Sequence, residues 1–161
     1  MNARTLQYML VGLVAVFLVL GSFFLFPLAS HAPTASPQEK NDVETVSIEA
    51  GGGTIVAEVV RTREDLERGL SGRDSLALGT GMWFDFGSPD RWGIWMKDMR
   101  FPIDIVWFDE NLSIVSIKIS VAPETYPEAF YPSRPARFVL EISSGAVEKY
   151  RLEVGNQVLL R

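Results

Sequence analysis

Two carboxylates lie within otherwise apolar stretches of this 161-residue sequence and are its best candidates for chemistry. Asp104 lies in the run IDIVWF at 103–108, and Glu141 lies in FVLEI at 138–142. A buried charge needs a partner, and Lys97 or Arg73 could supply one for Asp104. Several roles stay open for the carboxylates. Each could be structural, as an ion pair or an acceptor of backbone N–H groups, or both could grip a ligand at the mouth of a pocket.

Most other kinds of site are excluded by residue types. The sequence has no cysteine, and its single histidine, His31, precedes the folded region. Thiolate catalysis, cysteine or histidine zinc sites and a Ser-His-Asp triad are therefore ruled out there. The glycines at 51–53 suit a turn better than a phosphate loop, because no helix start follows them. We expect no metal and no cofactor, while an acid/base carboxylate pair, as in sugar hydrolysis, stays open.

Aromatic residues supply the remaining candidates. Four tryptophans fall between residues 83 and 107, and their strand-like context favours burial in a small core. Trp95 is the exception, because it alternates with Lys97 and Met99. The methionines at 82, 96 and 99 are expected to pack in the core rather than bind copper. The predicted polar cluster, for binding or for structure, comprises Arg73, Trp95, Lys97, Asp104 and Glu141.

These residues fall in one predicted domain, residues 43–161. Alternating and β-branched patterns predict strands over residues 43–50, 54–60, 82–86, 92–97, 103–108, 112–121, 138–142 and 157–160. Thr62 begins a short helix that ends at Gly69 or Gly72, and a second helix runs from Ser143 or Ser144 to Tyr150. We expect a turn at residues 109–111, where Asn111 would tolerate the left-handed backbone that such a turn often needs. The fold class is α+β and mostly antiparallel: a small rolled sheet or barrel with one or two short helices.

The segment between residues 122 and 136 stands apart from these elements. It contains four prolines and is too long for a plain connection. We expect it to be a binding loop or a flap packed over the core.

The N-terminal segment predicts a membrane location. Residues 8–26 are uncharged and would span about 28 Å as a helix, close to the thickness of a bilayer. We expect residues 1–7 to be a cytoplasmic tail, 8–28 a transmembrane anchor or uncleaved signal, and 29–42 a flexible linker. Arg4 precedes the span, so the positive-inside rule places the domain outside the cytoplasm. Cleavage near Ala32 would instead release a secreted domain.

The sequence resembles a known family in six short segments. They are GLSGR at 69–73, GMWFDF at 81–86, WMKDM at 95–99, FPIDIV at 101–106, VLEI at 139–142 with Gly145, and GNQV at 155–158. Their order and spacing are similar to the domain of unknown function 192 (DUF192) family across residues 55–160. The resemblance implies a compact β-rich domain, often behind a signal or membrane segment, and carries over no activity. Its motif positions include Arg73, Met82, Trp95, Met96, Lys97, Asp104 and Glu141.

Some residues depart from the family pattern. Ser71 and Met99 stand where methionine and threonine are expected, and Asn111 and Asn156 stand where glycine and aspartate are usual. The missing acid at Asn156 weakens the case for any site built there.

Together these features predict a membrane-anchored, extracytoplasmic module that binds a ligand or an envelope protein without catalysis. The formal net charge of −5 argues against nucleic acid as a partner. One alternative is a carboxylate-dependent hydrolase or lyase acting on cell-envelope material, which would need Asp104 and Glu141 in one water-accessible cleft. Another is a structural domain within a larger membrane assembly.

Overall fold

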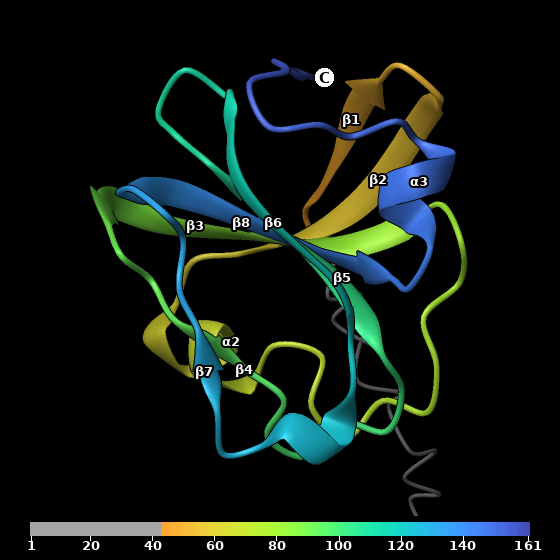
Figure 1. Cartoon of the computed structure of the whole chain (residues 1–161), viewed down its shortest axis with the longest axis vertical. Helices are drawn as coiled ribbons and strands as arrows, with labels where there is room; N and C mark the ends of the chain where they lie inside the picture. The colour runs from red at the N-terminus through yellow and green to blue at the C-terminus, as the bar shows by residue number, and fades with distance from the viewer. Residues whose placement is uncertain (1–42) are drawn as a thin grey trace, which may run out of the picture. The chain divides into compact units, whose positions relative to one another are not determined.

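The computed structural model describes residues 43–161. They form a seven-stranded sheet in the order β6-β5-β8-β3-β2-β1-β9, a two-stranded ribbon of β4 and β7, and short helices (Figure 1). The strands are β1 Thr45–Ala50, β2 Gly53–Val60, β3 Thr80–Asp90, β4 Ile94–Trp95, β5 Ile103–Phe108, β6 Ile114–Val121, β7 Ala129–Phe130, β8 Ala136–Ser143 and β9 Leu159–Leu160. The helices are α2 Arg63–Arg68, α3 Ala146–Lys149 and the 3-10 turn η1 Pro123–Thr125.

The predicted N-terminal segments lie outside these residues. This holds for the tail at 1–7, the span at 8–28 and the linker at 29–42. Within residues 43–161, no helix is both long and apolar enough to cross a membrane.

The sheet is mostly antiparallel, which confirms the α+β prediction at that level. Neighbouring strands pair antiparallel everywhere except between β2 and β3, which run parallel. A parallel pair needs a crossover connection, and α2 with the loop after it supplies that connection.

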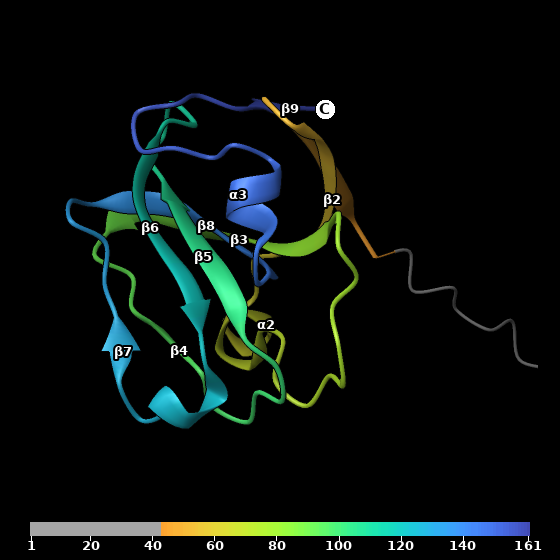
Figure 2. The ribbon, with the colours of Figure 1, turned by 45° about the vertical axis from the view of Figure 1, so that its right-hand side comes forward.

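The sheet is open, with β6 and β9 at its edges. The described strands therefore do not form the closed barrel that was the alternative prediction. The chain before β9 joins the two edges at one end only. There, Ser113 forms an isolated bridge with Gln157, and the Ile114 N–H donates to the Asn156 carbonyl. Figure 2 shows β9 lying along β1.

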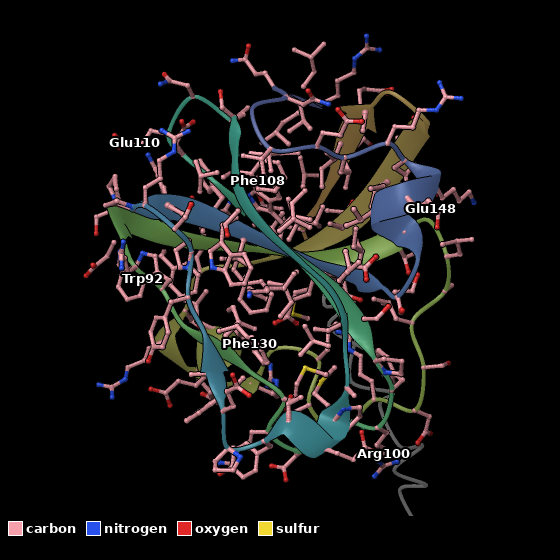
Figure 3. The ribbon with its side chains drawn as sticks, in the orientation of Figure 1. Trp92, Arg100, Phe108, Glu110, Phe130 and Glu148 are labelled. Atoms are coloured by element: carbon pink, nitrogen blue, oxygen red, sulfur yellow. The ribbon has the colours of Figure 1, made fainter. Side chains whose placement is uncertain are left out.

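Both faces of the central strands are covered, which explains their nearly continuous apolar sequence. We call the buried cluster that includes Trp83, Val106, Phe108, Ala146 and Tyr150 the α3-side core, and the one that includes Leu70, Phe84, Ile105, Trp107 and Val139 the α2-side core. Figures 1 and 2 show α3 and α2 on opposite sides of β3 and β8. Figure 3 shows Phe108 and Phe130 on these two sides.

Turn chemistry explains two of the connections. The hairpin between β1 and β2 turns at Gly51 and Gly52, and a Cβ on Gly52 would lie 2.3 Å from the Lys149 carbonyl oxygen. Glycine there lets the hairpin approach the end of α3. In the predicted turn at 109–111, the Asp109 carboxylate accepts from the backbone of Asn111 and Ser113. The left-handed residue is Leu112, with φ 61°, rather than Asn111.

The predicted strand at 92–97 is much shorter than expected. Only Ile94 and Trp95 pair, and their partners Phe130 and Ala129 come from the proline-rich segment. That segment therefore forms the other half of a two-stranded ribbon beside the α2-side core, against which Phe130 packs.

Candidate functional site

The two predicted carboxylates lie on adjacent strands but on opposite faces of the sheet. Ile105 of β5 pairs with Glu141 of β8, while Asp104 pairs with Ile142. Residues paired across a ladder point to the same face, and successive residues alternate. Glu141 therefore shares the α2 side with Ile105 and with Met82, its partner on β3. Asp104 points toward α3, so the structure does not bring the two acids together.

Asp104 binds backbone groups. Its side chain is fully buried, and its two oxygens accept from the Ser120 N–H at 2.8 Å and the Val147 N–H at 3.0 Å. These bonds tie β5 to the end of β6 and to the start of α3. Of the roles considered for Asp104, the acceptor of backbone N–H groups is the one observed.

Arg73 pairs with a different acid. Its guanidinium donates two hydrogen bonds to the Glu58 carboxylate, at 2.7 and 2.5 Å. This bidentate arrangement is a strong form of ion pair, and the bond from Arg73 lowers the pKa of Glu58. Arg73 is thus not a partner of Asp104, and it acts on Glu141 only through its charge.

Glu141 is the exceptional acid of the described domain. Its side chain is 5% exposed, and its Oε2 has no hydrogen-bond partner within residues 43–161. Burial raises the pKa of Glu141 to about 8, and the charge of Arg73 opposes that shift only in part. A buried carboxyl without a partner is costly, and such groups are concentrated at functional sites.

A pocket of about 160 Å³ lies over this carboxyl. The end of α2 and the turn after it form one wall, and β3 and the region of β4 form the other. The lining is largely apolar and aromatic, with Glu141 among the polar groups. The lining residues are Leu66, Glu67, Arg68, Gly69, Leu70, Ser71, Phe84, Phe86, Gly93, Ile94, Trp95, Met99 and Glu141.

Gly69 lets the backbone pass close to Glu141. It ends α2 with φ 51° and ψ −133°, a conformation that favours glycine. A Cβ at this position would lie 3.3 Å from Phe84 Cζ and 3.7 Å from Glu141 Oε2. Of the two helix ends that the sequence predicted, Gly69 and Gly72, the structure has the first, and Gly69 is therefore also a wall of the pocket.

Trp95 and Lys97 were expected to share a face of one strand, but only Trp95 lines the pocket. Trp95 is 48% exposed at the pocket and meets the Tyr126 ring edge-on, with ring centroids 6.2 Å apart. Lys97 has an exposed side chain outside the pocket lining, and its carbonyl accepts from the Ser71 hydroxyl at 2.8 Å. Of the five predicted residues, Trp95 and Glu141 share this pocket.

Sequence reasoning missed the residues that shape the pocket around Glu141. Phe84 and Phe86 lie two residues apart on β3 and so share a face of the strand. The sequence pattern did not single out that face, because the other face carries a large apolar residue as well. Leu66 lies on α2, whereas Leu70 follows the C-cap Gly69 and reaches the pocket from the turn after the helix. Within residues 43–161, no group of three or more His, Cys, Asp or Glu side chains is placed to hold a metal ion.

Comparison with known proteins identifies the family. The family model for DUF192, described as an uncharacterised ACR, matches residues 46–160. The chain belongs to the DUF192 family. The match contains every residue that lines the pocket over Glu141, so the pocket is part of this DUF192 domain.

Two solved structures are similar to the DUF192 domain. One, from Sinorhizobium meliloti 1021, is described as a candidate transcription regulator; the other is a protein of unknown function from Novosphingobium aromaticivorans. Each is 25% identical with a TM-score of 0.66. The first match covers 73% of this chain and 92% of the other, and the second covers 81% and 94%. No curated protein matches the chain.

Proposed function

We propose that this DUF192 domain is an extracytoplasmic module that binds a small ligand in the pocket over Glu141, without catalysis. The observation that carries the proposal is the Glu141 carboxyl, which is buried beneath a largely apolar pocket and has no hydrogen-bond partner at Oε2 among the described residues. A ligand that hydrogen bonds to this group would remove the cost of leaving it unsatisfied.

The dimensions of the pocket support a small ligand rather than a protein segment. An apolar cavity of about 150 Å³ is large enough to hold benzene. The pocket over Glu141 has about that volume and a largely apolar and aromatic lining. A ligand with one ring or a short aliphatic body and one polar group would fit such a site.

The family resemblance supports the same pocket. Four of the six segments that carry the resemblance contribute lining residues. They supply the turn at Gly69–Ser71, Phe84 with Phe86, Trp95 with Met99, and Glu141. Segments far apart in the sequence thus meet at one place.

The hydrolase or lyase alternative has no such support. It needed Asp104 and Glu141 in one cleft, and the two side chains point to opposite faces of the sheet. Both oxygens of Asp104 are already bonded to backbone N–H groups.

The first experiment tests binding at the pocket. We expect single-ring fragments, screened against the ¹⁵N-labelled full-length chain, to shift the NMR signals of Gly69, Ser71 and the Trp95 indole together. Trp95→Ala removes one aromatic wall and should weaken the fragments that bind by roughly tenfold, about 1.4 kcal/mol. Ile119→Ala, which removes an exposed apolar side chain on β6 outside the pocket, is the control and should leave affinity unchanged. Shifts scattered over the surface and insensitive to Trp95→Ala would contradict the proposal.

A second experiment tests the proposed location. The uncharged run at 8–26 and Arg4 before it support a single-pass anchor with the domain outside the cytoplasm. We expect protease added to intact cells to digest residues 43–161. A domain that is protected in intact cells and digested only after lysis would place it in the cytoplasm.

A further inference from the structure

We propose that the ligand of the pocket over Glu141 is a small organic ammonium, whose N–H groups donate to the Glu141 carboxylate while its apolar body packs against the aromatic walls. This inference rests on the binding function proposed above and names the chemistry of its ligand.

The charges around the pocket support a cation. Two other charged side chains line it, and each already has a partner: Glu67 pairs with Arg63 at 2.8 Å, and Arg68 pairs with Asp65. Arg73, whose charge reaches Glu141, is held by Glu58. If Glu141 at the floor of the pocket ionises, its carboxylate therefore has no ion-pair partner among the described lining residues. A cation from outside would supply it.

The aromatic lining suits the same ligand. The rings of Phe84 and Phe86 stack with centroids 6.2 Å apart, and Phe86 stacks on Trp92 at 4.5 Å. Trp95 closes the lining at the solvent side. Aromatic faces attract cations as well as apolar groups, and the attraction strengthens where water is excluded.

Hydrogen-bond geometry favours an ammonium over a neutral acceptor. A protonated carboxyl donates one hydrogen bond, so a ligand carbonyl would satisfy only the protonated oxygen. An ammonium carries up to three donors and can form charge-assisted hydrogen bonds with the ionised Glu141 carboxylate, which has an unpartnered oxygen, Oε2, among the described residues.

Binding of an ammonium should release a proton. In the free protein the pKa of Glu141 is raised to about 8, so the carboxyl is largely protonated at pH 7 and must ionise to pair with the cation. Affinity should rise by up to about tenfold per pH unit between pH 6 and 7, with a smaller rise toward pH 8.

The charged groups that face Glu141 are few. Glu58 with Arg73 lies beside it, Asp65 with Arg68 and Glu67 with Arg63 lie along α2, and Lys118 of β6 lies on the same face with its ammonium 6.0 Å from the Phe130 ring. The sequence has a single histidine, His31, which is not among residues 43–161.

The test compares probes of one shape and different charge. Benzylammonium, benzyl alcohol and phenylacetate are titrated calorimetrically into the full-length chain at pH 6, 7 and 8, in two buffers of different ionisation enthalpy. We expect benzylammonium to bind at least tenfold more tightly than benzyl alcohol at pH 8, to release a proton at pH 7, and phenylacetate to bind weakest. Glu141→Gln should reduce the preference for benzylammonium to less than threefold. Glu148→Gln, which removes an exposed carboxylate on α3, is the matched control and should leave the preference unchanged.

The possible outcomes distinguish the ammonium inference from the proposed binding function on which it rests. If benzyl alcohol binds at the pocket as tightly as benzylammonium in both the wild type and Glu141→Gln, the ammonium inference is wrong and the binding function stands. If benzyl alcohol binds more tightly than benzylammonium, the ligand is a neutral donor or acceptor and the inference is again wrong. If no ring-containing probe shifts the NMR signals of Gly69, Ser71 and the Trp95 indole in the fragment screen, both proposals are wrong.

Discussion

Replacing Glu141 with glutamine is expected to stabilise the domain at alkaline pH by several kcal/mol and to flatten its dependence on pH. The pKa of Glu141 is about 8 in the folded protein against 4.5 for the ordinary side chain, so between these values the folded state binds more protons than the unfolded state. The free energy of unfolding then falls as pH rises. A shift of this size corresponds to a loss of about 3–5 kcal/mol from pH 4 to pH 8. Glutamine has no proton to lose and so escapes that loss.

Urea unfolding of the full-length chain at pH 5 and pH 8.5 measures this effect. At pH 8.5 the glutamine variant should be the more stable protein, and at pH 5 the two should lie much closer together. Glu148→Gln is the control, because Glu148 is exposed on α3. Parallel pH profiles for the wild type and Glu141→Gln would show that Glu141 ionises as easily in the folded state as in the unfolded chain.

Replacing Asp104 with alanine is expected to have the opposite effect, a loss of about 3–5 kcal/mol in the free energy of unfolding. Asp104 is fully buried and accepts from the Ser120 and Val147 N–H groups. Alanine leaves both donors buried without an acceptor and creates a cavity. Asparagine keeps one carbonyl oxygen and should cost less, about 1–3 kcal/mol.

Urea unfolding at pH 7 compares these variants with Asp74→Ala. Asp74 is also an aspartate, but its side chain is largely exposed and pairs with Arg100 at the surface. Removing such a pair should cost no more than about 1 kcal/mol. If Asp104→Ala were as mild as Asp74→Ala, the two backbone bonds to Asp104 would contribute little to the fold.

The sequence predicted that both acids would be buried, but not which face each would occupy. Alternation within a strand fixes which residues share a side, and IDIVWF shows that Asp104 lies with Val106 and Phe108. The relation between two strands depends on register, and a shift of one residue moves every side chain to the opposite face. Glu141 pairs with Ile105 rather than with Asp104, and nothing local to either strand specifies that.

The ribbon of β4 and β7 was mispredicted for a related reason. The run at 92–97 has strand-forming residues throughout, yet only Ile94 and Trp95 pair, because their partner strand is two residues long. That partner comes from a proline-rich segment some 35 residues later, where local propensity argues against a strand. Pairing over this distance is a tertiary property that residue preferences do not encode.

The pocket was therefore only partly predictable. Of the five predicted residues, Trp95 and Glu141 both line the pocket, while Lys97, Asp104 and Arg73 face elsewhere or are already paired. The remaining walls come from α2 and β3, which meet through the parallel crossover between β2 and β3. The family resemblance, confirmed by the DUF192 match, named the right segments without saying that they converge.

One measurement tests the central claim most directly: the titration of the Glu141 side-chain carboxyl by ¹³C NMR, in the full-length chain without ligand. A carboxyl that is buried, unpartnered and covered by an apolar pocket should titrate with a midpoint of about 8. The Glu141→Gln variant assigns the signal by its absence. A midpoint at or below the ordinary value of 4.5 would mean that water or a charged neighbour already satisfies Glu141, and the case for a ligand site at this pocket would be lost.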